Sequence, residues 1–374
     1  LKQYKPTVDK LTKIVGKSHV LIDEQDTRHY RQGIRFGEGK VLAVVCPGTL
    51  LEQWQTLQTI IEADCVVIMQ AANTGLTGGS TPYGDDYDRP VIIMSTRRLQ
   101  GIQVVLDGKQ VVCLPGATLD NLERTLKPYN REPHSVIGSS CIGASVLGGV
   151  CNNSGGALVR RGPAYTEMAL YARVNESGKL ELINHLGIDL GNTAEEILTR
   201  LQTQDYETGQ ITTQTTQLAS DNRYAHDVKQ VDADSPARFN ADPTRLYEAS
   251  GSAGKVCVFA VRLDTFEKVE SKVFYIGSND HDDLTAIRRY LLTSLPSLPI
   301  AGEYIHRDAF SIGAKYGKDT FLFIERFGTV NIPRALALKD RIDGWLEKIK
   351  IRGLTDQILQ AITFFLPSHL PQRM

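Results

Sequence analysis

The chain has 374 residues, which is enough for two domains or for one large domain with an appended unit. Hydrophobic residues make up 41% and charged residues 23%, a mixture that excludes disorder as a description of the whole chain. The net charge of -1 gives no general attraction to nucleic acid or to an acidic surface, so any basic patch must be local.

The six cysteines lie scattered through apolar or glycine-rich segments, without a CxxC pair or a Cys/His cluster. This pattern favours buried thiols over disulfides and predicts no zinc, iron–sulfur or other metal site. The first 17 residues lack the apolar core of a signal peptide or membrane anchor, and no apolar run reaches the ~18 residues of a spanning helix. The first residue is Leu1 and not Met, which indicates a trimmed sequence.

Residues 1 to about 264 predict alternating short strands, turns and helices. The expected strands lie at 41–45, 65–69, 91–95, 111–114 and 255–262. Thr49 starts a helix with a capping-box pattern, because Glu52 follows three residues later. A second helix opens at Thr118, and the polar segment 204–234 is interpreted as a long surface excursion.

After about Asp264 the pattern changes. A strand is predicted at 272–276 and a helix at 283–292, with Leu284, Ile287 and Leu291 facing inward. From 332 onward the sequence is mostly helical, with two apolar stripes at Leu338, Ile342, Trp345 and Ile349 and at Ile358, Leu359, Ile362 and Phe365.

The strongest chemical signal is a glycine-rich stretch at 70–80, which directly follows the apolar strand predicted at 65–69. A phosphate needs several converging backbone N–H groups, and small residues such as Gly75, Gly78 and Gly79 let the backbone approach it. The stretch matches neither GxGxxG nor the P-loop pattern. Taken alone, it is also compatible with a plain tight turn.

A second small-residue stretch, at 137–156, holds six glycines and four serines in twenty positions. Close packing of a small-residue helix against a sheet would explain part of it, Gly148 and Gly149 above all. Two such stretches, each next to apolar strands, nevertheless favour one long polar ligand between them. A dinucleotide of the size of FAD has the required length and a central diphosphate.

These stretches resemble the FAD-binding domain of the vanillyl-alcohol-oxidase (PCMH-type) flavoprotein superfamily, and within it the respiratory, quinone-linked D-lactate dehydrogenases of bacteria. The resemblance covers nearly the whole chain. It is carried by QAANTGLT at 70–77, NREPHSVIGSSCIGAS at 130–145, RGPAYTEM at 161–168, HLGIDLG at 185–191, FAVRLDTF at 259–266 and LPSHLP at 366–371. Much of the superfamily has an Arg-Gly pair where this chain has Gln70-Ala71, so the resemblance to the dehydrogenases is the more specific one.

The resemblance implies an α+β protein: a two-subdomain PCMH-type FAD-binding domain at 1–264, the start of an α+β substrate cap at 265–310 and the start of a helical membrane-binding region at 311–374. It implies FAD contacts at Ala71, Ala72, Asn73, Thr74, Gly75, Gly79, Ser80, Gly138, Ser145, Gly155 and Val258. FAD is expected to bind noncovalently, because no His or Cys stands where a flavin attachment can be argued. The family enzyme continues well past Met374, and its later part carries a His-containing motif expected near the substrate.

The implied reaction is oxidation of D-lactate to pyruvate by hydride transfer to flavin N5, with electrons passed to a membrane quinone. The substrate carboxylate needs a cation, and Arg307 stands where related dehydrogenases place an arginine; pairing with Asp308 or Glu303 on a surface is the alternative. His134 and His306 are weak candidates for proton transfer, and structural histidines are the alternative. The catalytic base stays unassigned, and Arg131 either faces the flavin or anchors its loop.

Basic residues next to apolar faces between 331 and 374 are typical of an interfacial helix on anionic lipid, or of an amphipathic helix packed on the protein. The resemblance implies peripheral attachment to the cytoplasmic face of the bacterial inner membrane. Three other functions stay open: oxidation of another D-2-hydroxy acid such as D-2-hydroxyglutarate, a non-catalytic flavin-binding module, and a phosphate- or membrane-binding protein without flavin.

Overall fold

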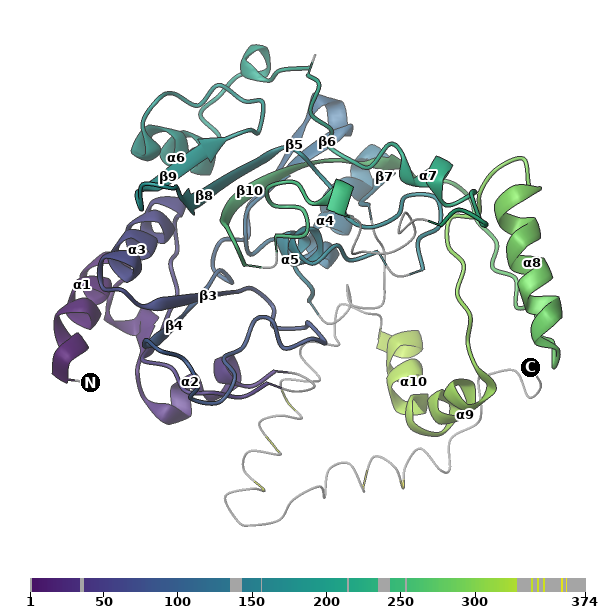
Figure 1. The fold of residues 1–374 in the computed structure, drawn as a ribbon, viewed down its shortest axis with the longest axis horizontal. Coiled ribbons are helices and arrows are strands. Elements are labelled where there is room, and N and C mark those ends of the chain that lie inside the picture. The colour runs from purple at the N-terminus through teal and green to yellow at the C-terminus, as the bar shows by residue number, and fades with distance from the viewer. Residues whose placement is uncertain are drawn as a thin grey trace. The chain divides into compact units, whose positions relative to one another are not determined.

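The computed structural model describes residues 2–33, 37–134, 143–155, 157–213, 215–234, 243–252 and 254–327, and the single residues 338, 342, 346, 358 and 361. Contacts between residues divide the chain into one unit at Leu1–Lys268 and a second at Val269–Met374. Figure 1 shows the elements of both, and each unit is described by itself below.

The first sheet of unit 1 has the strand order β1-β2-β4-β3. Its strands are β1 (Val20–Leu21), β2 (Ala43–Val45), β3 (Val66–Gln70) and β4 (Val91–Ser95). Strands β2 and β3 both run parallel to β4, whereas β1 pairs antiparallel with β2. The helices of this half are α1 (Lys5–Val15), α2 (Glu24–Arg31) and α3 (Leu50–Glu62). The parallel arrangement places the carboxyl ends of β3 and β4 at the same edge of the sheet.

The second sheet is antiparallel throughout and has the order β5-β6-β10-β8-β9. Its strands are β5 (Ile102–Val105), β6 (Gln110–Cys113), β8 (Ala169–Val174), β9 (Leu180–Asn184) and β10 (Cys257–Asp264). The helices α4 (Leu119–Leu126), α5 (Val146–Cys151), α6 (Ala194–Thr203) and α7 (Tyr224–Asp227) belong to this half, with a short ladder between β7 (Arg131–Glu132) and β11 (Phe266–Glu267). The predicted mixed α+β architecture with two subdomains is confirmed.

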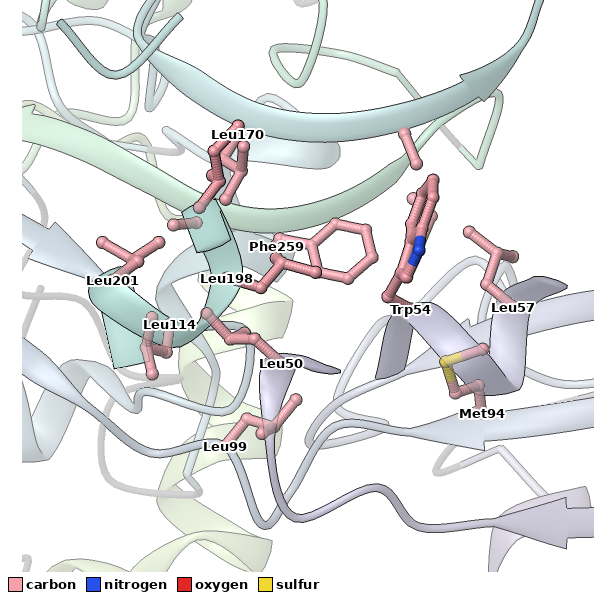
Figure 2. Close-up of a cluster of buried hydrophobic side chains, with 14 of the residues drawn as sticks. Leu50, Trp54, Leu57, Met94, Leu99, Leu114, Leu170, Leu198, Leu201 and Phe259 are labelled. Carbon is pink, nitrogen blue, oxygen red and sulfur yellow. The ribbon is translucent and has the colours of Figure 1, made fainter. Parts of the chain in front are cut away.

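Helix α3 joins the two sheets through one hydrophobic cluster, shown in Figure 2. Leu50, Trp54 and Leu57 project from α3 toward Met94 of β4 on one side and Phe259 of β10 on the other. The rings of Trp54 and Phe259 have their centroids 6.2 Å apart. Because apolar burial is the main favourable term in folding, this shared core fixes the two sheets relative to each other.

The helix starts follow the sequence signals closely. The Thr49 hydroxyl accepts the amide of Glu52 at 3.0 Å, and the Thr118 hydroxyl accepts the amide of Asn121 at 3.2 Å. The reciprocal bond of the predicted capping box differs, because the Glu52 carboxylate accepts from the amide of Gly48 at 2.6 Å and not from Thr49.

In unit 2 the described helices are α8 (His281–Thr293), α9 (Arg307–Tyr316) and α10 (Lys318–Phe327). The predicted inward face of α8 is half-buried. The predicted strand at 272–276 is wrong: the segment has no assigned helix or strand and pairs with no ladder among the described residues, and Val273 and Phe274 are each 78% exposed. A strand needs a neighbour for its N–H and C=O groups, and the described residues of unit 2 offer it none. Of the two predicted helical stripes, the structure describes only Leu338, Ile342 and Ile358, so both lie mostly outside the described residues.

Candidate cofactor-binding site

The first glycine-rich stretch leaves the carboxyl end of β3 and is anchored by Gln70, whose side chain is only 2% exposed. Its Nε2 donates to the carbonyl of Tyr30 at 2.8 Å and to the carbonyl of Ser80 at 2.6 Å. One buried amide therefore joins the first and last residues of the stretch. Hydrogen bonds of this kind fix a loop that has too few apolar side chains to hold itself by packing.

Asn73 gives this stretch its second anchor. Its backbone is left-handed, with φ of 56°, a conformation that asparagine tolerates better than most residues. Its Nδ2 donates to the carbonyl of Gln32 at 2.8 Å, while its Oδ1 accepts the Ser80 hydroxyl at 2.9 Å. The side chain thus ties the middle of the stretch to its end.

The backbone of this stretch remains available to a ligand. The amides of residues 71–80 donate no hydrogen bond to another residue that the structure describes. A Cβ on Gly75 would meet nothing within 4 Å, so open space lies beside the backbone there. N–H groups that donate to no described residue, on a chain of mostly small side chains, suit an anion such as a diphosphate. A plain turn whose amides donate to water remains the alternative, because much of the stretch is exposed.

The second stretch is described only from Gly143 to Gly155, and Gly138 lies outside the described residues. Ser145 caps α5: its hydroxyl accepts the amide of Gly148 at 3.1 Å. A Cβ on Gly148 would lie 2.6 Å from that hydroxyl, and Val146, Leu147 and Val150 pack into the core. The cap hydroxyl therefore gives a local reason for glycine at 148, whereas a Cβ on Gly149 would make only an ordinary contact, at 3.9 Å from the Cβ of Ser154.

Gly155 also has a packing reason. A Cβ there would lie 2.7 Å from the Cα of Pro163, so only glycine permits this close approach of two backbone segments. The same position was predicted to contact the cofactor, and close packing does not decide that question. The contact does show that the end of the second stretch lies against residues 162–163.

Val258 lies at an irregularity of β10, where the register against β8 shifts between Val258 and Ala260. Its carbonyl accepts from Nε2 of Gln53 on α3 at 3.1 Å. Next to it, the sulfur of Cys257 lies 3.7 Å from the sulfur of Met69, the penultimate residue of β3. The start of β10 thus lies beside the end of the strand that leads into the first stretch.

Helix α5 packs on the same strand, through a cluster that includes Val146, Val150 and Val258. In Figure 1, α5 lies close to β10 and beyond the end of β3. The structure therefore brings together the strand before the first stretch, the predicted Val258 contact and the helix of the second stretch. Open backbone at 71–80 beside this junction fits a nucleotide-diphosphate ligand.

His134 is buried, with 7% exposure. Its Nε2 lies 3.4 Å from the carbonyl of Arg161, which requires the proton on Nε2, and its Nδ1 is buried without a hydrogen-bond partner among the described residues. Burial lowers the pKa of His134 to about 4. The imidazole is therefore neutral near pH 7.

Arg131 anchors its own loop. Its guanidinium donates to the hydroxyl of Thr265 and, at 2.6 Å, to the carbonyl of the same residue. In unit 2, His306 caps α9 by accepting the amide of Asp308 at 3.1 Å, and the exposed Arg307 lies 3.6 Å from the Asp308 carboxylate. The roles predicted for His306 and Arg307 stay predictions.

Sequence reasoning missed three polar residues that hold this site: Gln70, Gln53 and Arg161. Gln70 ends a run of apolar strand residues, and a polar side chain at that position is a signal that it bonds to the turn that follows. Gln53 interrupts the apolar face of α3 in the same way. Arg161 begins a run already noted for its resemblance, but no local pattern indicates where its side chain goes.

Comparison with known proteins agrees with this geometry. Residues 41–180 match the model of an FAD binding domain, and residues 273–374 match that of "D-lactate dehydrogenase, membrane binding". The matched FAD-binding region contains both glycine-rich stretches. None of the described helices is long and apolar enough to cross a membrane.

Three curated proteins, each named quinone-dependent D-lactate dehydrogenase, align with 98–99% of the chain. Identity is 57% over 370 residues for the Haemophilus influenzae protein, 55% over 373 for that of Escherichia coli and 46% over 370 for that of Corynebacterium glutamicum. The chain is a homologue of the quinone-dependent D-lactate dehydrogenases. It spans 65%, 65% and 64% of these three relatives, so it is similar to about two thirds of each.

Proposed function

We propose that this chain is the cofactor-binding part of an FAD-dependent D-lactate dehydrogenase that oxidises D-lactate to pyruvate and passes the electrons to a quinone. The observation that carries the proposal is the row of amides at 71–80 that donate to no residue in the described part of the chain, beside the junction of β3, β10 and α5. The names of the three relatives and the FAD-binding match support the choice of cofactor and substrate.

In this proposal the first stretch binds the diphosphate through the amides of 71–75 and of Gly79 and Ser80. Gly138, Ser145, Gly155 and Val258 line the rest of the cofactor. FAD, bound noncovalently, would supply the hydride acceptor at N5. Gln70 and Asn73 keep the amides in place before the ligand arrives, which reduces the ordering cost of binding.

The two histidines differ in what they can do. With a pKa near 4, His134 is a weak base at neutral pH and is better suited to donating or accepting a hydrogen bond than to removing a proton. His306 already accepts a backbone amide at the start of α9. Arg307, exposed at its helix start, remains the proposed partner of the substrate carboxylate, since its fork can bind two oxygens.

We further propose peripheral attachment of the second unit to an anionic membrane surface, on the cytoplasmic face of the inner membrane. The membrane-binding match at 273–374 supports this assignment. Large apolar side chains are exposed in the same unit, among them Val273, Phe274, Tyr275, Ile312 and Tyr316. Sedimentation with vesicles of anionic and of neutral lipid tests it; equal recovery in the supernatant with both would contradict the proposal.

The decisive experiment for function is the absorbance spectrum of the purified chain with FAD, followed by anaerobic titration with D-lactate. Flavin absorbance that bleaches with D-lactate supports the dehydrogenase. Flavin absorbance without bleaching supports a non-catalytic flavin-binding module. Faster bleaching by D-2-hydroxyglutarate or L-lactate in a substrate panel would assign another 2-hydroxy acid, and failure to bind FAD would reject the proposal altogether.

A further inference from the structure

Arg161 is a buried arginine whose side chain, 8% exposed, makes contacts at the start of the second glycine-rich stretch. Its Nη2 donates to the Glu132 carboxylate at 2.5 Å. Its Nη1 donates to the carbonyls of Pro133 and His134 at 3.0 and 3.2 Å. Charge-assisted bonds from a planar guanidinium are strong and directional, so they fix the position of these two carbonyls.

These contacts join the two flanks of the second stretch. The stretch spans 137–156 in the sequence; Pro133 and His134 precede it, and Arg161 follows it. The imidazole of His134 lies against the carbonyl of Arg161, so the side chain of each residue reaches the backbone of the other. A single buried residue therefore closes the base of the loop that contains the stretch, and it lowers the entropy that a ligand would otherwise have to remove.

The base of this loop is also tied to the rigid part of unit 1. The guanidinium carbon of Arg161 lies 4.1 Å from the ring centroid of Phe266, a cation–π contact. Phe266 belongs to β11, which pairs with β7 through Glu132, and Arg131 bonds to Thr265 beside it. The loop base is thus fixed to the end of the second sheet.

We propose that Arg161 is a positioning residue for the cofactor: it joins residues 132–134, which precede the second glycine-rich stretch, to residue 161, which follows it, and so fixes the two ends from which that stretch binds the dinucleotide. The inference rests on the proposed FAD site and gives Arg161 an indirect role, through the carbonyls of Pro133 and His134. Lysine cannot replace it, because one ammonium group lacks the planar fork that serves a carboxylate and two carbonyls while stacking on Phe266.

The test compares Arg161→Lys with Arg245→Lys. Arg245 is a matched control, since it also pairs with a largely buried carboxylate, Asp221 at 2.6 Å, and lies over an aromatic ring, that of Tyr165. FAD dissociation constants are measured by flavin fluorescence, and unfolding of the FAD-free proteins is followed by circular dichroism. Arg161→Lys is expected to weaken FAD binding by about 10- to 100-fold, the range for lost charge-assisted hydrogen bonds, and Arg245→Lys by less than about 3-fold.

Two further variants distinguish a positioning role of Arg161 from a general loss of stability. Glu132→Gln keeps the guanidinium and its bonds to the carbonyls, so a smaller loss of about 3- to 10-fold is expected. In Arg161→Ala, millimolar methylguanidinium should restore FAD affinity and the resolved absorption bands of bound flavin, which a merely unstable protein would not show. Wild-type affinity in Arg161→Lys, equal losses in both lysine variants, or no rescue would overturn the inference. If the wild-type chain binds no FAD, the proposed function fails instead.

Discussion

The two glycine-rich stretches meet the same chemical requirement, a backbone without bulky side chains, but they are held in different ways. The first is held locally: Gln70 and Asn73 bond to residues within it and to the neighbouring chain at Tyr30 and Gln32. The second is held from a distance, by Arg161 at its base and by packing of Gly155 on Pro163. Loss of one local anchor, Gln70 or Asn73, leaves the other in place. Loss of the Arg161 contacts releases both ends of the second stretch at once.

The largest effect is expected at the first stretch. Gln70→Leu removes both bonds of the buried amide, so we expect FAD affinity to fall about 100-fold and the protein to lose about 2 kcal/mol of unfolding free energy. The matched control is Gln103→Leu, because Gln103 is also buried and donates to the carbonyl of Leu201 at 2.6 Å. Similar destabilisation with unchanged FAD affinity is expected there. Equal FAD loss in both variants, measured by fluorescence titration, would show that Gln70 has no special role.

The second largest loss of FAD affinity is expected at Asn73, whose backbone is left-handed. In Asn73→Ala the backbone must keep φ of 56° without the side-chain bonds, and we expect a loss of about 10- to 30-fold in FAD affinity. Asn73→Gly relieves the strain and should recover part of that loss. Asn130→Ala serves as the control, because Asn130 is also left-handed, with φ of 53°, but lies after α4. If Asn73→Gly binds no better than Asn73→Ala, backbone strain is not the cause.

A smaller effect is expected at the cap of α5 in the second stretch. Ser145→Ala removes the acceptor for the Gly148 amide, a change that costs about 1 kcal/mol, so FAD affinity should fall about 5-fold. Thr193→Ala removes an equivalent cap from α6, where the hydroxyl accepts from the Glu196 amide at 3.2 Å. That control should lose similar stability and keep its FAD affinity. If isothermal titrations show that Ser145→Ala keeps its FAD affinity and Thr193→Ala loses it, α5 lies outside the site.

The smallest effect on FAD affinity is expected at His134, at the base of the second stretch, where burial instead makes the stability of the protein depend on pH. Burial lowers the pKa of His134 to about 4 in the folded chain, from 6.5 when unfolded. Between these values the unfolded chain holds a proton that the folded chain lacks, so the free energy of unfolding rises as the pH increases from about 4 to 6.5 and then levels off. In His134→Gln, the free energy of unfolding measured with urea should rise less steeply with pH across this range, by a slope equivalent to at most one proton. An unchanged slope would mean that the imidazole is accessible to protons in the fold.

The sequence was most informative about local features of the backbone. Small residues after an apolar strand predicted the first stretch, and hydroxyl residues predicted the helix starts at Thr49 and Thr118, because such signals are local. Gln70 bonds both to Ser80, within the stretch, and to the distant Tyr30, and only the first contact has a local signal. Gln53 and Arg161 escaped prediction because their partners lie far away along the chain: Gln53 bonds to Val258, and Arg161 reaches back 28 residues to Pro133. Spacing in sequence carries no information about such contacts.

The difference between local signals and contacts between distant residues also explains the wrong prediction of a strand at 272–276. Alternating and β-rich residues indicate that a segment suits a sheet, but the strand itself exists only where another chain segment supplies hydrogen bonds. The described part of unit 2 contains no such neighbour for Val273 and Phe274. Predictions for Gly138, and for the helical stripes at 338–349 and 358–365, fall largely on residues that the structure does not describe.

Hydrogen exchange of the backbone amides, followed by mass spectrometry with and without FAD, tests the central claim most directly. We expect slower exchange on FAD binding in peptides covering 71–80, because these amides donate to none of the described residues and would gain phosphate oxygens as acceptors. We also expect protection around 143–155, with little change in α6. Bound flavin without protection at 71–80 would contradict the account, since the cofactor would then lie elsewhere.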